Sequence, residues 1–379
     1  MAKNSSYLLT ALLIILSGTL YLKFSDYIIS AFEKRFVLNS LECEGESQSS
    51  LSQVAYYAID ELNYKNLQLS YVDDADNISS CTAGWADMPY LSPKVDIKTR
   101  FNYASVTKVF TSELILDLVR RQQIKLDDKL VDLLDLTDKY QLQDERVAKI
   151  TVADLLSHRA GFDRNITPDS MITANPWCPY HMAHLQAIKL DFDPNSKNVY
   201  SNIGYCLLSQ VIESHYQDSY ISTSEEYFGF KNNDIGFLQR QPEAQPNVPF
   251  MNQTKQIRGL DFYALSAVGG LSGTSVALAE YIHTISKRKY PNITDRPKNI
   301  NCDKKQVRGC HGFAGYEYAP KTSTLYWRNG RLPNTNALMT VDNRGNVITF
   351  LSNTDDPNSW LSKHEMLVKF IYKKTTGKG

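Results

Sequence analysis

The sequence predicts an α+β fold in which both ends of the chain contribute strands to one antiparallel sheet, with helices between them. Alternating apolar residues over 67–72, and again between 324 and 352, are typical of half-buried strands. The intervening segments show helical periodicity, and the sequence has neither a β–α–β alternation nor a glycine-rich phosphate loop. We therefore expect an antiparallel sheet flanked by helices, with an all-helical subdomain over residues 136–265.

The individual elements follow from these patterns. Helices are expected over residues 53–62, 106–124, 200–215, 275–285 and 359–374, and Thr151 is the expected N-cap of a further one. Strands are expected over residues 67–72, 82–87, 324–328, 336–342 and 346–352, and the turn 343–345 joins the last two. Three prolines make residues 239–258 a predicted loop.

Composition excludes several classes of protein. The chain has 379 residues, of which 42% are hydrophobic and 22% are charged, enough for one large domain or two smaller ones. Lys plus Arg and Asp plus Glu both total 41, so the formal net charge is zero. Because nucleic-acid binders are usually strongly basic, no nucleic-acid partner is expected.

An uncharged 16-residue run from Tyr7 to Leu22 lies between Lys3 and Lys23. As a helix it is roughly 24 Å long, slightly short of a ~30 Å hydrocarbon core. It predicts a membrane anchor or a signal sequence over residues 1–23, and the bulky residues that follow favour the uncleaved anchor. A buried N-terminal helix is the third interpretation.

If this segment is an anchor, the rest of the chain is exported and lies at the periplasmic face of the inner membrane. If the segment is a cleaved signal sequence, the rest of the chain is secreted. Residues 24–50 end in a run rich in Ser, Glu and Gln, which predicts a linker. Residues 51–375 are then the globular domain.

An even set of six cysteines suits an oxidising compartment. Cys302 and Cys310 bracket a short basic loop, and Cys43 and Cys81 flank the first strands, which leaves Cys178 and Cys206. Six cysteines allow 15 connectivities, so this pairing is one interpretation among several.

A rival interpretation takes Cys178, His181 and His184 as three metal ligands. No fourth ligand is evident, and we expect neither a metal nor a cofactor.

Three short motifs carry residues suited to acyl transfer. Ser105 and Lys108 lie one helical turn apart, on the same face of the predicted helix. If the pKa of the Lys108 amine is lowered, that amine can take the proton of the Ser105 hydroxyl. The phenol of Tyr200, with a usual pKa of ~10, becomes a base when a cation such as Lys108 stabilises its phenolate. Asn202 can orient the lysine or bind a substrate amide. The same Ser-x-x-Lys spacing occurs again at Ser286, within a run of basic residues, and we interpret that copy as part of a solvated basic surface.

The third motif, Arg328-Asn329-Gly330, ends a predicted strand. The glycine permits a substrate to approach the strand closely. The backbone N–H of Arg331 can then pair with that of Ser105 as an oxyanion hole.

Together these motifs resemble those of the serine β-lactamase and penicillin-binding-protein superfamily. The resemblance is to its branch of class C β-lactamases, D-alanyl-D-alanine carboxypeptidases and esterases, and it spans roughly residues 51–365. It is carried by the segments 101–108, 150–162, 200–208 and 267–271.

The resemblance implies roles for the site residues. Ser105 is the implied nucleophile, Lys108 assists its deprotonation and that of the attacking water, and Tyr200 is the proton shuttle. Asn202 binds a substrate amide or orients Lys108. The tyrosine at the second motif points away from class A β-lactamases, which have Ser-Asp-Asn there. His158 matches a landmark residue of the resembling family stretch and is expected to be structural.

The sequence departs from this branch at the third motif, where Lys-Thr-Gly or His-x-Gly is usual. Arg328 keeps the charge and can bind a carboxylate through two hydrogen bonds. We expect it to hold a substrate carboxylate. Its alternatives are to lower the pKa of Tyr200 or to form a surface salt bridge.

The expected function is that of an exported serine hydrolase acting on a small-molecule or peptide ester or amide, as an esterase or D-amino-acid peptidase. The alternatives are a non-catalytic, penicillin-binding-like envelope protein that binds a ligand, and a β-lactamase.

Overall fold

The computed structural model describes residues 32–136, 141–230, 235–238, 259–298, 300–354 and 356–376. The predicted anchor at 7–22 and the predicted loop at 239–258 lie outside these ranges. Among the described residues, no helix combines the length and the apolar character needed to cross a membrane.

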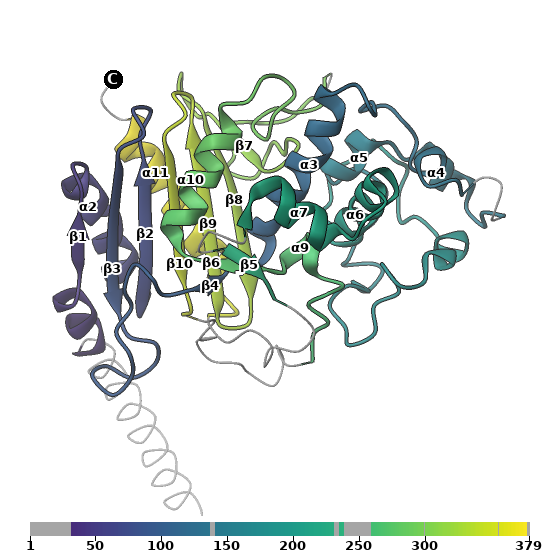
Figure 1. Ribbon diagram of the computed structural model, residues 1–379. Helices are drawn as coiled ribbons and strands as arrows, with labels where there is room; N and C mark the ends of the chain where they lie inside the picture. Colours follow the sequence, from purple (N-terminus) through teal and green to yellow (C-terminus); the bar gives the residue numbers. More distant parts are fainter. Residues whose placement is uncertain are drawn as a thin grey trace, which may run out of the picture.

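A seven-stranded antiparallel sheet joins both ends of the chain, as predicted (Figure 1). Its order is β1-β3-β2-β10-β9-β8-β7. The strands are β1 (Glu42–Glu44), β2 (Asn66–Val72), β3 (Ile78–Gly84), β7 (Tyr316–Tyr318), β8 (Leu325–Leu332), β9 (Thr335–Asp342) and β10 (Val347–Ser352). The strand expected over 82–87 begins earlier and ends at Gly84, whose φ of +81° favours a residue without a Cβ.

Helices cover both faces of this sheet and give the molecule two hydrophobic cores. On one face, α2 (Gln48–Asp60) packs with α11 (Trp360–Thr376) around Trp327 and Phe350. On the other face, α10 (Ser275–Ser286) packs against β2 and β10. The second core continues from there into the helical half of the molecule.

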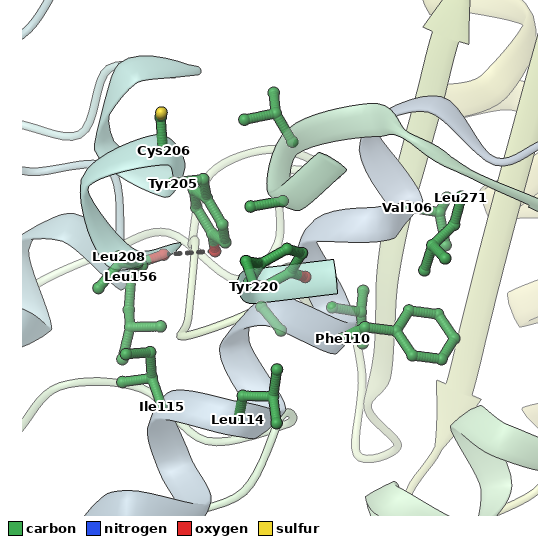
Figure 2. Close-up of a cluster of buried hydrophobic side chains, with 14 of the residues drawn as sticks. Val106, Phe110, Leu114, Ile115, Leu156, Tyr205, Cys206, Leu208, Tyr220 and Leu271 are labelled. Carbon is green, nitrogen blue, oxygen red and sulfur yellow. Dashed lines mark hydrogen bonds between the residues drawn. The ribbon is translucent and has the colours of Figure 1, made fainter. Parts of the chain in front are cut away.

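The helical half is built around α3 (Lys108–Arg120), which follows the 3-10 turn η1 (Ala104–Thr107). Around it lie α4 (Leu130–Leu133), α5 (Val152–Leu156), α6 (Ile203–Tyr216), α7 (Tyr220–Phe228) and α9 (Ser266–Gly269). Figure 2 shows Phe110 and Leu114 of α3 within this core, together with Tyr205 of α6 and Tyr220 of α7. Thr151 caps α5 through a reciprocal capping box with Asp154, as its position predicted.

Two expectations about organisation need correction. Residues 42–44 and 48–50 of the predicted linker belong to β1 and α2, and the polar composition misled because α2 buries only one face. The region 136–265 is not wholly helical. It contains β5 (Ile235–Phe237), which pairs with β6 (Leu271–Gly273) in a second sheet completed by β4 (Phe101–Asn102).

Three disulfides join Cys43 to Cys81, Cys178 to Cys206 and Cys302 to Cys310, which confirms the predicted pairing. The Cys178–Cys206 bond contradicts the alternative in which Cys178 is a metal ligand, because a metal-binding cysteine needs a free thiolate. The disulfide between Cys302 and Cys310 closes the loop that the sequence marks as basic.

Candidate active site

Ser105 lies in η1, where the large sheet meets the helical half. The backbone of Tyr103 is fixed by a hydrogen bond from its N–H to Leu271 O (2.8 Å). Ala104 then adopts a φ of +44°, a left-handed conformation that costs energy for a residue with a Cβ. This turn places Ser105 at the start of α3, with its side chain partly exposed to a cavity.

Lys108, one turn later, is completely buried beneath Ser105. Its Nζ lies 3.1 Å from Ser105 Oγ and donates a hydrogen bond to Val268 O at 2.7 Å. Burial lowers the pKa of Lys108 well below its usual value, and the positive charges of Arg328 and Arg164 lower it further, against the opposing charge of Asp169. The lowered pKa favours the neutral amine, the form that can accept the proton of the serine hydroxyl.

Tyr200 reaches the same hydroxyl from the segment before α6. Its OH lies 2.5 Å from Ser105 Oγ and donates to Asn202 Oδ1 at 3.2 Å. Asn202 Nδ2 in turn donates to Asp169 Oδ2 at 2.5 Å. Asn202 thus orients Tyr200, and no hydrogen bond joins it to Lys108 among the described residues.

Asp169 lies in an irregular loop, 33 residues before Asn202. The sequence motifs did not predict that Asp169 belongs to the site. Neither periodicity nor spacing connects a carboxylate in a loop with the start of a distant helix.

The third motif lies on an edge of β8 that faces η1. Strand β7 covers β8 only along Leu325–Trp327, and beyond that point η1 packs against β8. Gly330 makes this packing possible, since a Cβ there would come within 2.3 Å of Tyr103 O and 2.8 Å of Ser105 N. An oxyanion hole from the N–H groups of Ser105 and Arg331 remains a prediction.

Arg328 differs from what the sequence suggested. It is buried, with 2% of its surface exposed, and is not a surface salt-bridge residue. Its Nε donates to Ser105 O (3.1 Å) and its Nη1 to Ala314 O (2.9 Å). Its guanidinium therefore positions the nucleophile's backbone and lowers the pKa of Lys108, with its hydrogen bonds directed to the protein.

Two buried histidines surround Arg328 on its inner side. His311 Nε2 lies 3.3 Å from Arg328 Nη1, and the ring of His158 packs 4.6 Å from that of Tyr200. Burial holds the pKa of both histidines well below the usual range, and the charge of Arg328 acts in the same direction. Neutral His158 packs behind Tyr200, in keeping with the structural role expected for it.

The other residues of the third motif face α11. Asn329 Nδ2 lies 3.3 Å from His364 Nδ1, and the guanidinium of Arg331 stacks over the ring of Trp360 at 5.6 Å. Burial, followed by the charge of Arg331, lowers the pKa of His364 to about 3. Both residues of the motif still line the cavity in front of Ser105.

That cavity has a volume of about 160 Å³. Besides the predicted residues Ser105, Tyr200, Arg328, Asn329 and Arg331, it is lined by four that the sequence analysis missed: Arg164, Arg308, Tyr316 and Trp360. Arg164 and Arg308 lie in loops, Tyr316 begins β7 and Trp360 begins α11, and only the tertiary fold brings these four to the motifs.

The chemistry available here is nucleophilic. Ser105 Oγ lies within hydrogen-bond distance of both an amine of lowered pKa and a phenol, the two groups that can take and return its proton. The arrangement suits attack on a carbonyl carbon.

Comparison with known proteins agrees with this geometry. The family model described as Beta-lactamase matches residues 66–371. A putative fimbrial assembly protein, FimD of serogroup D from Dichelobacter nodosus, is 34% identical over 84% of this chain and 82% of its own length.

Two solved structures are also similar. The D-amino acid amidase of Ochrobactrum anthropi has a TM-score of 0.68 and 16% identity over 87% of this chain and 98% of its own. A structure of SurE with D-Leu has a TM-score of 0.64 and 21% identity, covering 87% and 76% of the two chains.

Proposed function

Because the chain belongs to the β-lactamase family, within the superfamily of serine β-lactamases and penicillin-binding proteins, we propose that it is an exported acyl-serine hydrolase. The observation that carries this proposal is the position of Ser105 Oγ, 3.1 Å from Lys108 Nζ and 2.5 Å from Tyr200 OH. Its substrate is an ester or an amide, as for an esterase or a D-amino-acid peptidase.

The reaction has two halves. Ser105 Oγ attacks the carbonyl carbon, and its proton passes to Lys108 or Tyr200 and from there to the leaving group, which departs protonated and leaves both groups ready for the second half. Water then attacks the acyl-serine ester, and the same two groups take its proton and return it to Ser105 Oγ. The predicted oxyanion hole stabilises the negative oxygen in both halves.

Export is supported by the three disulfides, which form and persist in oxidising compartments. We place the domain at the periplasmic face of the inner membrane, held by the apolar segment at residues 7–22. An active reporter fused after residue 50 would agree with this location, and a reporter retained in the cytoplasm would contradict it.

Mass spectrometry after incubation with a fluorophosphonate, and separately with a labelled penicillin, tests the nucleophile. We expect one adduct, on Ser105. Ser105→Ala should remove the adduct and reduce ester hydrolysis by at least ~10³-fold without changing the melting temperature. Ser286→Ala is the matched control and should label like the wild type. An adduct on Ser286, or hydrolysis that persists in Ser105→Ala, would contradict the acyl-serine mechanism at Ser105.

A second candidate is a non-catalytic role in fimbrial assembly, which the 34% identity to FimD favours. It predicts that Ser105→Ala restores surface fibres in a strain lacking the gene as well as the wild type does. Restoration that depends on Ser105 would favour the hydrolase.

A further inference from the structure

The cavity in front of Ser105 has an unusual charge. Four arginines line it, namely Arg164, Arg308, Arg328 and Arg331, and its lining includes neither Asp nor Glu. At about 160 Å³ it is smaller than the ~300–1,000 Å³ typical of sites that enclose a whole ligand, so it suits one group of a larger substrate.

Three of these arginines form no ion pair with a carboxylate in the part of the chain that the structure describes. Across the described residues, no ion pair within 4.0 Å joins Arg164, Arg308 or Arg328 to an Asp or Glu. The nearby acid Asp169 is used by Asn202. Elsewhere in the same chain, arginines such as Arg120 and Arg146 do pair with acids.

Aromatic rings hold the two exposed arginines at the cavity. The guanidinium of Arg164 lies 4.7 Å from the ring centroid of Tyr200. That of Arg308 lies 5.4 Å from the ring of Tyr316, and its Nη2 donates to the Tyr316 hydroxyl at 3.3 Å. Stacking fixes the plane of a guanidinium while its edge can still donate hydrogen bonds.

We propose that this cavity binds a phosphate monoester group of the substrate through Arg164 and Arg308. The inference rests on the proposed function, because it names the substrate class of the same site. The edge of a guanidinium can donate two hydrogen bonds to two oxygens of one phosphate. A phosphate monoester dianion also balances the positive charge of two arginines, whereas a single carboxylate balances the charge of one.

Binding to the full-length Ser105→Ala protein tests this without turnover. Phenyl phosphate and benzoate are titrated by calorimetry at constant ionic strength and pH 7.5. We expect phenyl phosphate to bind at least ~10-fold more tightly than benzoate. Arg308→Gln and Arg164→Gln, each added to this background, should weaken phenyl phosphate binding by ~10-fold. Arg35→Gln removes an exposed arginine outside the cavity and should leave the affinity unchanged.

Equal affinities for the two probes, or an unchanged affinity in both cavity variants, would overturn the proposal. This failure is distinguishable from failure of the proposed function. Selective phenyl phosphate binding in a protein that never labels with fluorophosphonate would keep the anion site and reject the hydrolase. Labelling of Ser105 without selectivity for phosphate would do the reverse.

Discussion

At its N-terminal end, helix α3 carries Lys108 beside Arg328, two buried basic side chains, and among the described residues no carboxylate forms an ion pair with either. From its middle to its C-terminal end the same helix buries Glu113 and Asp117 against arginines. Arg120 Nη2 lies 2.5 Å from Glu113 Oε1, and Arg288 Nε lies 3.2 Å from the same oxygen.

The two ends show what buried charge does in each place. Where arginines meet carboxylates, charge is balanced and the contacts hold α3 to its neighbours. Where basic groups gather without a paired carboxylate, burial and mutual repulsion lower the pKa of Lys108, and positive charge faces the cavity. The comparison predicts that substitutions at one end change stability and that those at the other change catalysis.

The largest stability effect is expected at Glu113, whose side chain is fully buried. Glu113→Gln keeps the shape but leaves Arg120 and Arg288 with less negative charge, so it should reduce the free energy of unfolding by about 2–3 kcal/mol. Chemical denaturation measures this, with the exposed Glu226→Gln as the matched control. The catalytic efficiency of the folded protein should stay at the wild-type value, and a tenfold loss of it would break the comparison.

Next in size is Arg328, at the catalytic end. Removing its charge lets the pKa of Lys108 rise, so less of the lysine is neutral at a given pH. Arg328→Ala should therefore reduce hydrolysis of nitrophenyl acetate by about 10-fold at pH 7 and move the acidic limb of the pH–rate profile to higher pH.

Arg328→Lys sharpens this test because it restores the charge without the guanidinium hydrogen bonds. Its acidic limb should stay near that of the wild type even where kcat falls. If the pH–rate profiles of the wild type and Arg328→Ala superimpose, Arg328 does not act on hydrolysis through the pKa of Lys108. The melting temperature of each variant shows whether it folds.

The smallest effect is expected for Arg288→Gln. The side chain of Arg288 is 38% exposed, and Glu113 retains Arg120 and the Tyr227 hydroxyl as partners. Solvent screening limits the loss of unfolding free energy to less than ~1 kcal/mol, with unchanged hydrolysis. A loss as large as that of Glu113→Gln would show that Arg288, and not Arg120, is the main partner.

The sequence by itself predicted the family and much of the fold. Strands over 67–72, 336–342 and 346–352 and the cap at Thr151 depend on local periodicity and capping chemistry, which the chain carries directly. The cysteine pairing was one of 15 connectivities, and only the structure decided it. Ser105 and Lys108 are one helical turn apart, so their contact was also local. Tyr200 was found by resemblance, although it lies 95 residues away.

Only the tertiary structure decided which groups surround that nucleophile. Asp169, Arg164 and Arg308 come from loops with no periodicity, so nothing in the sequence linked them to Ser105. Arg328 illustrates the reason. Its position on a strand end was predictable, but whether its guanidinium faced solvent, substrate or Ser105 O depended on η1 packing against the β8 edge. That packing is made by residues more than 200 positions apart, and it places the guanidinium of Arg328 against the backbone of Ser105.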